Sequence, residues 1–412
     1  MSIASLLSSI AGYVSSLDTC RTNIRSALVN QGVSASDHDF SDFAADIASI
    51  SGGGVTTTAL SVTANGTYTA PTGTAYTPVT VNVSGGSVIP SDLPSGKALI
   101  VGYSIPAGVP EDCKTITLRI VHDSADTVSV VDWGDNTATT TSTGSGAKSL
   151  SHTYTDTGDH IASVSVSGGT ISVGGTTLGH NIGGTVSYVQ SFIKWAVINA
   201  GVSMLEDYAF SYCMNMEEIR LSGSSITKID SYAFQYCAKL KTFDIPNTVT
   251  AIGSYAFYYC TGLLTVSLPD NASFTAISND TFSNCFSVSE MSLPSRISSF
   301  GNNSFNNCYN WKNVVIPSNV TDLPSSVFSQ CRSFTSLTIP SSITSIGSSA
   351  FNYLVGLQKL RFNGTTPPAV ANSNAFSSLR RACIISVPTG YLSAYTSAQN
   401  YPSSSSYTYI EE

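Results

Sequence analysis

The chain has 412 residues, and charged side chains make up only 11% of them, against about a quarter in an average soluble domain. The formal net charge is −8 and no basic stripe is present, which excludes a protein that binds the nucleic-acid backbone. The length predicts several modules rather than one core. No apolar run reaches the ~18 residues that a membrane-spanning helix needs, so we expect no insertion into a membrane.

Residues 1–50 predict a small helical segment for anchoring or oligomerisation. Apolar side chains recur at helical spacing near the start, and Ile3, Ile10 and Leu17 follow one another at intervals of seven. This spacing indicates either a coiled-coil seam between copies of the chain or a helix packed within its own small domain. Two further helices are expected before a glycine-rich hinge at 51–54.

Residues 55–84 predict a small β module, because valine and tyrosine alternate with polar residues between turn signals. The stretches Asn65–Pro71 and Tyr76–Val83 resemble a module of phage tail and fibre proteins, "N-G-T-Y-x-A-P … Y-x-P-V-x-V-N-V". This resemblance implies that the chain is part of a virion rather than of a cell surface.

Residues 96–175 predict an all-β sandwich. The stretch Val131–Thr137, followed by Ser151–Tyr154 and Gly158–Val164, resembles a PKD domain, whose pattern is "[VI]-x-W-G-D-G-T … H-x-Y … G-x-[YH]-x-[VI]-x-[VI]". Asn136 replaces the usual glycine, and asparagine also accepts turn conformations. The resemblance implies an immunoglobulin-like spacer or protein-contact module.

Asp132, Asp135 and His152 could form a metal or acid–base cluster in this region. In the PKD-like pattern such residues fix turns and strand packing, and we favour that role. All five histidines precede residue 200, and no nucleophile elbow, P-loop or dinucleotide motif stands between a strand and a helix. The sequence therefore predicts no catalytic residue, no metal site and no cofactor.

A repeat occupies residues 200–390. Its copies place Phe three positions before Cys, at Phe210/Cys213, Phe234/Cys237, Phe257/Cys260, Phe282/Cys285, Phe305/Cys308 and Phe328/Cys331, and two more keep Phe351 and Phe376 before leucine. Successive Phe positions differ by 23 to 25 residues, which predicts a solenoid. Ala256, Phe257 and Cys260 have helical spacing, and the alternating residues that follow predict a strand ended by Pro269. We therefore predict one strand and one short helix per coil.

The repeat resembles the BspA-like leucine-rich repeats, "I-x-x-x-A-F-x-x-C-x-x-L-x-x-[IV]-x-[IL]-P". This resemblance implies a non-enzymatic solenoid for surface adhesion and protein recognition, found on bacterial surfaces and on phage structural proteins. Six cysteines share one repeat position, so we expect a ladder of buried thiols rather than disulfides. The tyrosine-rich segment 391–412 is the expected cap of the solenoid.

The outward positions of the repeat strands form two columns that vary in chemistry while the inward positions do not. We predict that these columns bind a partner; the alternative is a merely solvated sheet face. The first column is Glu218, Thr242, Thr265, Glu290, Asn313, Ser336 and Lys359, and the second is Arg220, Asp244, Ser267, Ser292, Val315, Thr338 and Arg361. The tyrosines between residues 208 and 259 could add a second contact surface, or pack between coils.

The predicted architecture is thus multidomain and mainly β. We expect a non-enzymatic phage fibre or spike on the exterior of the virion, which contacts other virion proteins through its N-terminal helices. The solenoid would bind a host surface protein or glycan, and parallel copies in a homo-oligomer would gain avidity. The absence of a secretory signal fits this reading. The alternatives are a bacterial cell-surface adhesin of the same repeat family and, with less support, a glycan hydrolase, which would need paired carboxylates in a cleft.

Overall fold

The computed structural model describes residues 66–68, 79–81, 88–109, 114–174, 192–221 and 223–412. The chain divides into two compact units, residues 1–87 and 88–412. In the first unit, β1 (Gly66–Tyr68) pairs antiparallel with β2 (Val79–Val81). The helices predicted within residues 1–50 lie outside the described residues.

Two six-stranded sheets begin near the start of the second unit, in the orders β12-β10-β3-β8-β5-β6 and β15-β13-β11-β9-β4-β7. Residues 98–174, which we call the two-sheet region, contribute strands to both. The bounds of these strands are β3 Leu99–Ile105, β4 Thr115–His122, β5 Val128–Asp132, β6 Thr140–Thr143, β7 Gly146–Thr153, β8 Gly158–Ser167 and β9 Ile171–Val173. Along β4, buried Ile116, Leu118 and Ile120 alternate with half-buried neighbours, because successive side chains of a strand point to opposite faces.

The two-sheet region continues directly into the repeat. β10 (Ile193–Ile198) lies antiparallel to β3 and parallel to β12 (Glu218–Arg220), while β11 (Val202–Leu205) lies parallel to β9 and β13 (Lys228–Ile229). A Cβ on Gly102 of β3 would lie 2.1 Å from the Trp195 ring of β10, so glycine is needed at this close contact. The domain boundaries remain a prediction. Strands of the two-sheet region and of the repeat share sheets and one hydrophobic core.

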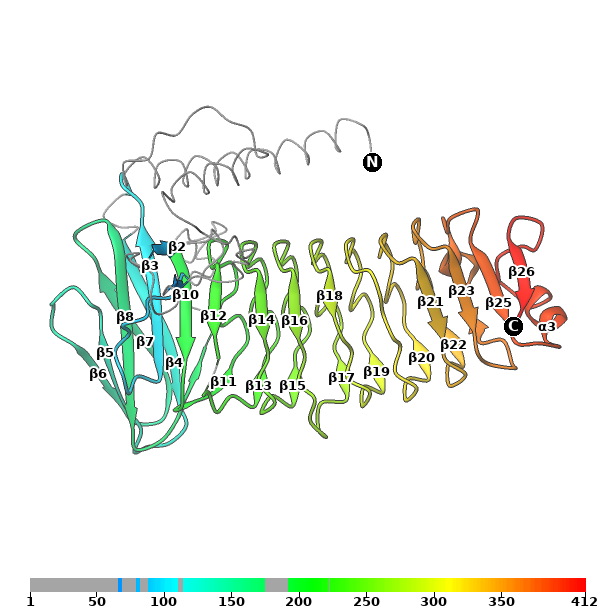
Figure 1. Ribbon diagram of the computed structural model, residues 1–412. Helices are drawn as coiled ribbons and strands as arrows, with labels where there is room; N and C mark the ends of the chain where they lie inside the picture. The colour runs from blue at the N-terminus through cyan, green and yellow to red at the C-terminus, as the bar shows by residue number, and fades with distance from the viewer. Residues whose placement is uncertain (1–65, 69–78, 82–87, 110–113, 175–191, 222) are drawn as a thin grey trace, which may run out of the picture. The chain divides into compact units, whose positions relative to one another are not determined.

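From β12 onward the chain winds in coils that follow one another in a single row (Figure 1). Strands of successive coils pair in parallel, as in Thr242 with Thr265 and Thr338 with Arg361. The remaining strands are β14 Thr242–Asp244, β15 Ala251–Ile252, β16 Thr265–Ser267, β17 Ala276–Ile277, β18 Glu290–Met291, β19 Ser299–Phe300, β20 Asp322–Leu323, β21 Ser336–Ile339, β22 Ser345–Ile346, β23 Lys359–Phe362, β24 Ala369–Val370 and β25 Ile384–Val387.

The prediction of a short helix in each coil is wrong. The Ala-Phe-x-x-Cys segment forms turns instead, with left-handed backbone just before it, at Tyr255 (φ 59°), and inside it, at Tyr259 (φ 57°). The Phe257 amide donates to the Thr281 oxygen of the next coil at 2.9 Å, whereas a helix would direct that amide four residues back along the chain. Helical spacing correctly predicted the inward direction of Ala256, Phe257 and Cys260, which are all 0% exposed.

The interior of the repeat is a ladder of phenylalanine rings. The rings of Phe210, Phe234 and Phe257 stack with centroid distances of 5.5 and 5.4 Å. The stack extends through Phe282 and Phe305, with distances of 5.2 and 5.9 Å. Each coil therefore buries its apolar side chains against its two neighbours, as a solenoid requires.

Residues 373–412 pack against the last coils. This segment contains the 3-10 helix η3 (Ser373–Phe376), the short helix α3 (Leu392–Thr396) and β26 (Thr408–Glu411), which extends the sheet of β25 in parallel. Buried Tyr395 donates to the Gly364 oxygen at 2.7 Å, and Tyr401 donates to the Pro368 oxygen at 2.9 Å. These hydroxyls satisfy backbone oxygens at the end of the stack.

Candidate binding surfaces

The fourteen residues of the two predicted columns all lie at least partly open to solvent. Thr242 and Asp244 are exposed, and Phe243 between them is 1% exposed. The same pattern holds in β21, where Ser336 and Thr338 flank the buried Leu337. The strand alternation therefore separates an apolar inward column from the fourteen outward residues, which we call the outward face.

The outward face is divided into three parts rather than being one continuous sheet. Glu218 and Arg220 belong to the sheet of the two-sheet region. The middle part is the three-stranded sheet β14-β16-β18, which aligns Thr242, Thr265 and Glu290. The last part is β21-β23-β25-β26, and its parallel pairing extends the predicted columns past the repeat.

Trp311 lies where the middle part ends. It occupies the position that Leu263 and Val288 hold in the two preceding coils, and its indole Nε1 donates to the Met291 oxygen at 3.2 Å. In the described part of the chain, no backbone hydrogen bond joins residues 312–316 to a neighbouring coil. The Trp311 indole thus bonds to a backbone oxygen at the end of β18, and Val315 in the unpaired segment is 82% exposed.

Charged pairs lie at both ends of the outward face. Near the two-sheet region, Arg220 contacts Glu218 at 3.2 Å. At the far end, Lys359 and Arg361 contact the Glu412 carboxylate at 2.6 and 3.6 Å. Hydrogen bonds and charge from Lys359 lower the pKa of Glu412 below its usual value. The middle of the face is mostly hydroxyl-bearing, as in Thr242, Thr265 and Ser267.

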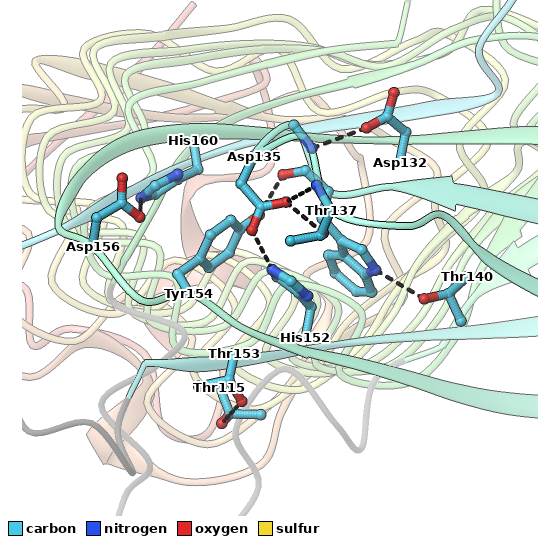
Figure 2. Close-up of polar contacts among 12 residues, drawn as sticks. Thr115, Asp132, Asp135, Thr137, Thr140, His152, Thr153, Tyr154, Asp156 and His160 are labelled. Carbon is cyan, nitrogen blue, oxygen red and sulfur yellow. Dashed lines mark hydrogen bonds and ion pairs between the residues drawn. The ribbon is translucent and has the colours of Figure 1, made fainter.

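The polar cluster predicted in the two-sheet region organises a turn. Asp132 accepts from the Gly134 amide at 3.0 Å, and Asp135 accepts from the Thr137 amide and hydroxyl at 3.2 and 2.6 Å. The other Asp135 oxygen contacts His152 Nε2 at 2.6 Å (Figure 2). These contacts use the carboxylates within the protein, and the residues that the structure describes include no group of three potential metal ligands.

Aromatic rings surround the same histidine. The Trp133 ring stacks on His152 at 5.2 Å, and the Tyr154 ring meets it edge-on at 4.7 Å. The buried Tyr154 hydroxyl donates to the Trp133 oxygen at 2.8 Å. Burial and nearby carboxylates raise the pKa of Tyr154 far above its usual value, so it remains a neutral donor. The arrangement packs the turn against β7 and β8.

Tyrosines directly before the Ala-Phe-x-x-Cys segment, and tyrosines inside it directly before the cysteine, form two columns of stacked rings. Tyr208, Tyr232 and Tyr255 stack at 4.7 and 4.9 Å. Tyr212, Tyr236 and Tyr259 stack at 4.7 and 5.1 Å. All six are half-buried. We call them the tyrosine columns.

The model of the BspA type leucine rich repeat region matches residues 182–310 and 271–383, with six copies. The chain carries a BspA-type leucine-rich repeat region. No curated protein matches the chain. Within the described residues, no helix is long and apolar enough to cross a bilayer.

Several solved structures are similar to this chain. A leucine-rich repeat protein of T. pallidum is 22% identical with a TM-score of 0.37, and the match covers 46% of this chain and 83% of that one. A leucine rich cell surface protein from Faecalibacterium prausnitzii is 20% identical with a TM-score of 0.25, covering 57% and 94%. The pneumococcal vaccine antigen PcpA is 14% identical with a TM-score of 0.27, covering 57% and 82%.

The fourteen residues of the predicted columns are all at least partly exposed. Ser292, Asn313 and Val315 lie outside the strands, and binding by the columns stays a prediction.

The sequence identified the BspA-type repeat. It gave no signal for the break at Trp311, because tryptophan fits the apolar repeat position as leucine does. It also gave no signal for the contact of Glu412 with Lys359, which are 53 residues apart.

Proposed function

We propose that the protein is a non-enzymatic recognition protein of the bacterial cell surface, which binds a surface protein or glycan through its BspA-type repeat. The observation that carries the proposal is the contrast between the two sides of the repeat strands. Phe and Cys recur inside, whereas the outward face changes its chemistry from coil to coil. A rigid stack with a variable face is suited to binding, because its backbone loses little conformational freedom when a partner docks.

The BspA-type family supports the surface location, since its resemblance implies adhesion. The two-sheet region would act as a rigid, PKD-like base for the repeat. The acids of the two columns, Glu218, Asp244 and Glu290, stand singly on three different strands. This flat arrangement lacks the paired carboxylates of a glycan hydrolase, so we propose no catalytic role.

A phage fibre is the second candidate. It rests on the resemblance of residues 65–83 to phage tail and fibre modules, of which the structure describes β1 and β2. In that reading, residues 1–50 contact other virion proteins and the chain assembles as a homo-oligomer.

Antibody labelling of intact producing cells tests the proposed location. We expect labelling at the bacterial surface without permeabilisation. Labelling confined to released virus particles would instead support the fibre.

Binding is tested separately with fluorescent full-length chain on intact cells. A variant with lysine at Thr242, Thr265 and Ser336 should lose binding. A variant with lysine at Ala251, Ala276 and Ser299, on the β15-to-β19 side, should bind as the wild type does. Equal binding by both variants would contradict the proposal.

A further inference from the structure

The six residues of the tyrosine columns have an unfavourable backbone conformation. Their φ angles lie between 57° and 61°, in the left-handed region that costs an ordinary residue about 1–2 kcal/mol. The next two coils fill the equivalent positions with Asp280, Asn284, Asn303 and Asn307, residue types that tolerate this region. The same left-handed φ recurs in later coils at Ser326, Gln330, Ser349 and Tyr353, so it belongs to the repeat rather than to tyrosine. Backbone preference therefore does not explain why three successive coils place tyrosine there.

The rings hold one another in place. Interplanar angles of 3° and 4° in the column of Tyr208, Tyr232 and Tyr255 show nearly parallel rings. Stacking covers the faces of the inner rings, so their edges and hydroxyls are the parts left for a ligand. Few torsions remain to be ordered on binding, which is the advantage of tyrosine at recognition surfaces.

The hydroxyls of one column, Tyr212, Tyr236 and Tyr259, are available for hydrogen bonding. These three hydroxyls have no hydrogen-bond partner among the described residues, and they are not among the buried polar atoms that lack a partner. They are therefore open to solvent. The tyrosines of the C-terminal segment differ, since Tyr395 and Tyr401 donate to backbone oxygens. The column of Tyr212, Tyr236 and Tyr259 thus presents an evenly spaced array of donors and acceptors.

The charge around the columns decides between classes of ligand. Residues 200–285 contain eight Asp and Glu against four Lys and Arg, a net charge of −4, whereas residues 286–412 carry +3. Burial, together with the nearby carboxylates of Asp207 and Asp280, raises the pKa of Tyr208 and Tyr255. Negative charge at these places disfavours an anionic polymer. Carboxylates and phenol hydroxyls together suit a ligand rich in neutral hydroxyl groups.

We propose that the tyrosine columns bind a neutral polysaccharide that runs along successive coils. The ring spacing of 4.7 to 5.1 Å is comparable with the length of one sugar unit in an extended chain. A repeating polymer matches this periodic array, whereas an irregular protein surface would not need it. The proposal rests on the recognition function of the repeat but uses a surface separate from the outward face.

Affinity electrophoresis of the full-length chain tests this proposal, in native gels containing galactomannan, mannan, dextran or polygalacturonate. We expect at least one of the three neutral polymers to retard the protein and polygalacturonate to have no effect. The variant Tyr212→Asn/Tyr236→Asn/Tyr259→Asn keeps the backbone type that Asn284 and Asn307 show. Loss of several hydroxyl hydrogen bonds should weaken its affinity about tenfold or more.

The matched control is Thr242→Ala/Ser336→Ala/Thr338→Ala on the outward face, which should retain polysaccharide binding. Thermal unfolding of each variant confirms that it is folded. The proposal is overturned if no neutral polymer retards the chain, if the asparagine variant is retarded equally, or if the columns bind only a protease-sensitive partner on cells. A failure here with cell binding through the outward face intact would leave the proposed function standing.

Discussion

The thiol of Cys260 donates to the backbone oxygen of Phe234, one coil earlier, at 3.0 Å. The same contact recurs from Cys237 to Phe210, at 3.2 Å, and from Cys285 to Phe257, at 3.1 Å. Cysteine is therefore both a small apolar side chain and a donor between coils. This explains why the repeat position holds cysteine more often than another small residue.

Thiol reactivity should be very low in the folded protein. Burial raises the pKa of Cys237, Cys260, Cys285, Cys308 and Cys331 well above the usual value, and only the thiolate reacts readily. We expect no alkylation of these residues by iodoacetamide at pH 8, and full alkylation in denaturant, by peptide mass spectrometry. Rapid labelling of the native chain, or a disulfide between neighbouring coils, would contradict the ladder.

Phe257→Ala should destabilise the repeat by about 3–5 kcal/mol, because it empties a fully buried ring site between two stacked neighbours. Urea unfolding measures the loss. Phe286→Ala is the control, since this half-buried ring stacks on Tyr309 and meets Tyr259 edge-on, and its expected cost is about 1 kcal/mol. Similar losses for both variants would argue against a shared interior.

The break at Trp311 should be visible by hydrogen exchange. Backbone amides of residues 312–316 make no hydrogen bond to a neighbouring coil in the described structure, whereas those of β16 lie between two paired strands. We expect amides 312–316 to exchange much faster in the native state. Equal protection of both segments would show that the sheet is continuous.

Asp123 should stabilise the two-sheet region in a pH-dependent manner. Hydrogen bonds from Thr170 and Thr127 lower the pKa of Asp123 from 3.8 to about 2. A carboxyl whose pKa is lowered by folding adds stability above its unfolded value, and this stability disappears as the pH falls through the folded value.

The variant Asp123→Asn should therefore have a lower Tm than the wild type at pH 7, with a difference that shrinks between pH 3.8 and about 2. Asp126→Asn, at a nearby exposed acid, should change Tm little at either pH. A difference for Asp123→Asn that is independent of pH would contradict the role assigned to its charge.

The sequence predicted the repeat well because each coil must place the same apolar residues inside. The period fixed Phe257 and Cys260 as interior residues, and strand alternation fixed Thr242 and Asp244 as outward. The prediction of a short helix in each coil failed, because two successive turns can bring Ala256, Phe257 and Cys260 to one side just as a helical turn does. Left-handed residues make these segments turns rather than a helix. The sequence did not indicate them in the first three coils, because tyrosine rarely adopts this conformation.

The continuity between the two-sheet region and the repeat could not be read from the sequence. β3 and β10 pair although they lie about ninety residues apart, with Val101 opposite Ala196, and no local pattern specifies such a partner. Turn residues were easier to predict. Asp132 and Asp135 were correctly interpreted as turn residues, because short acidic side chains accept hydrogen bonds from amides two residues ahead.

Site-specific photo-crosslinking tests the central claim most directly. A photoreactive residue is placed at Thr242, Thr265, Ser336 or Thr338, or at Ala251, Ala276 or Ser299 on the other strand side, and the full-length chain is irradiated on intact cells that bind it. The recognition account predicts adducts with a cell-surface molecule from the first set and none from the second. Adducts from the second set alone, or equally from both, would contradict the claim that the outward face is the surface that meets the partner.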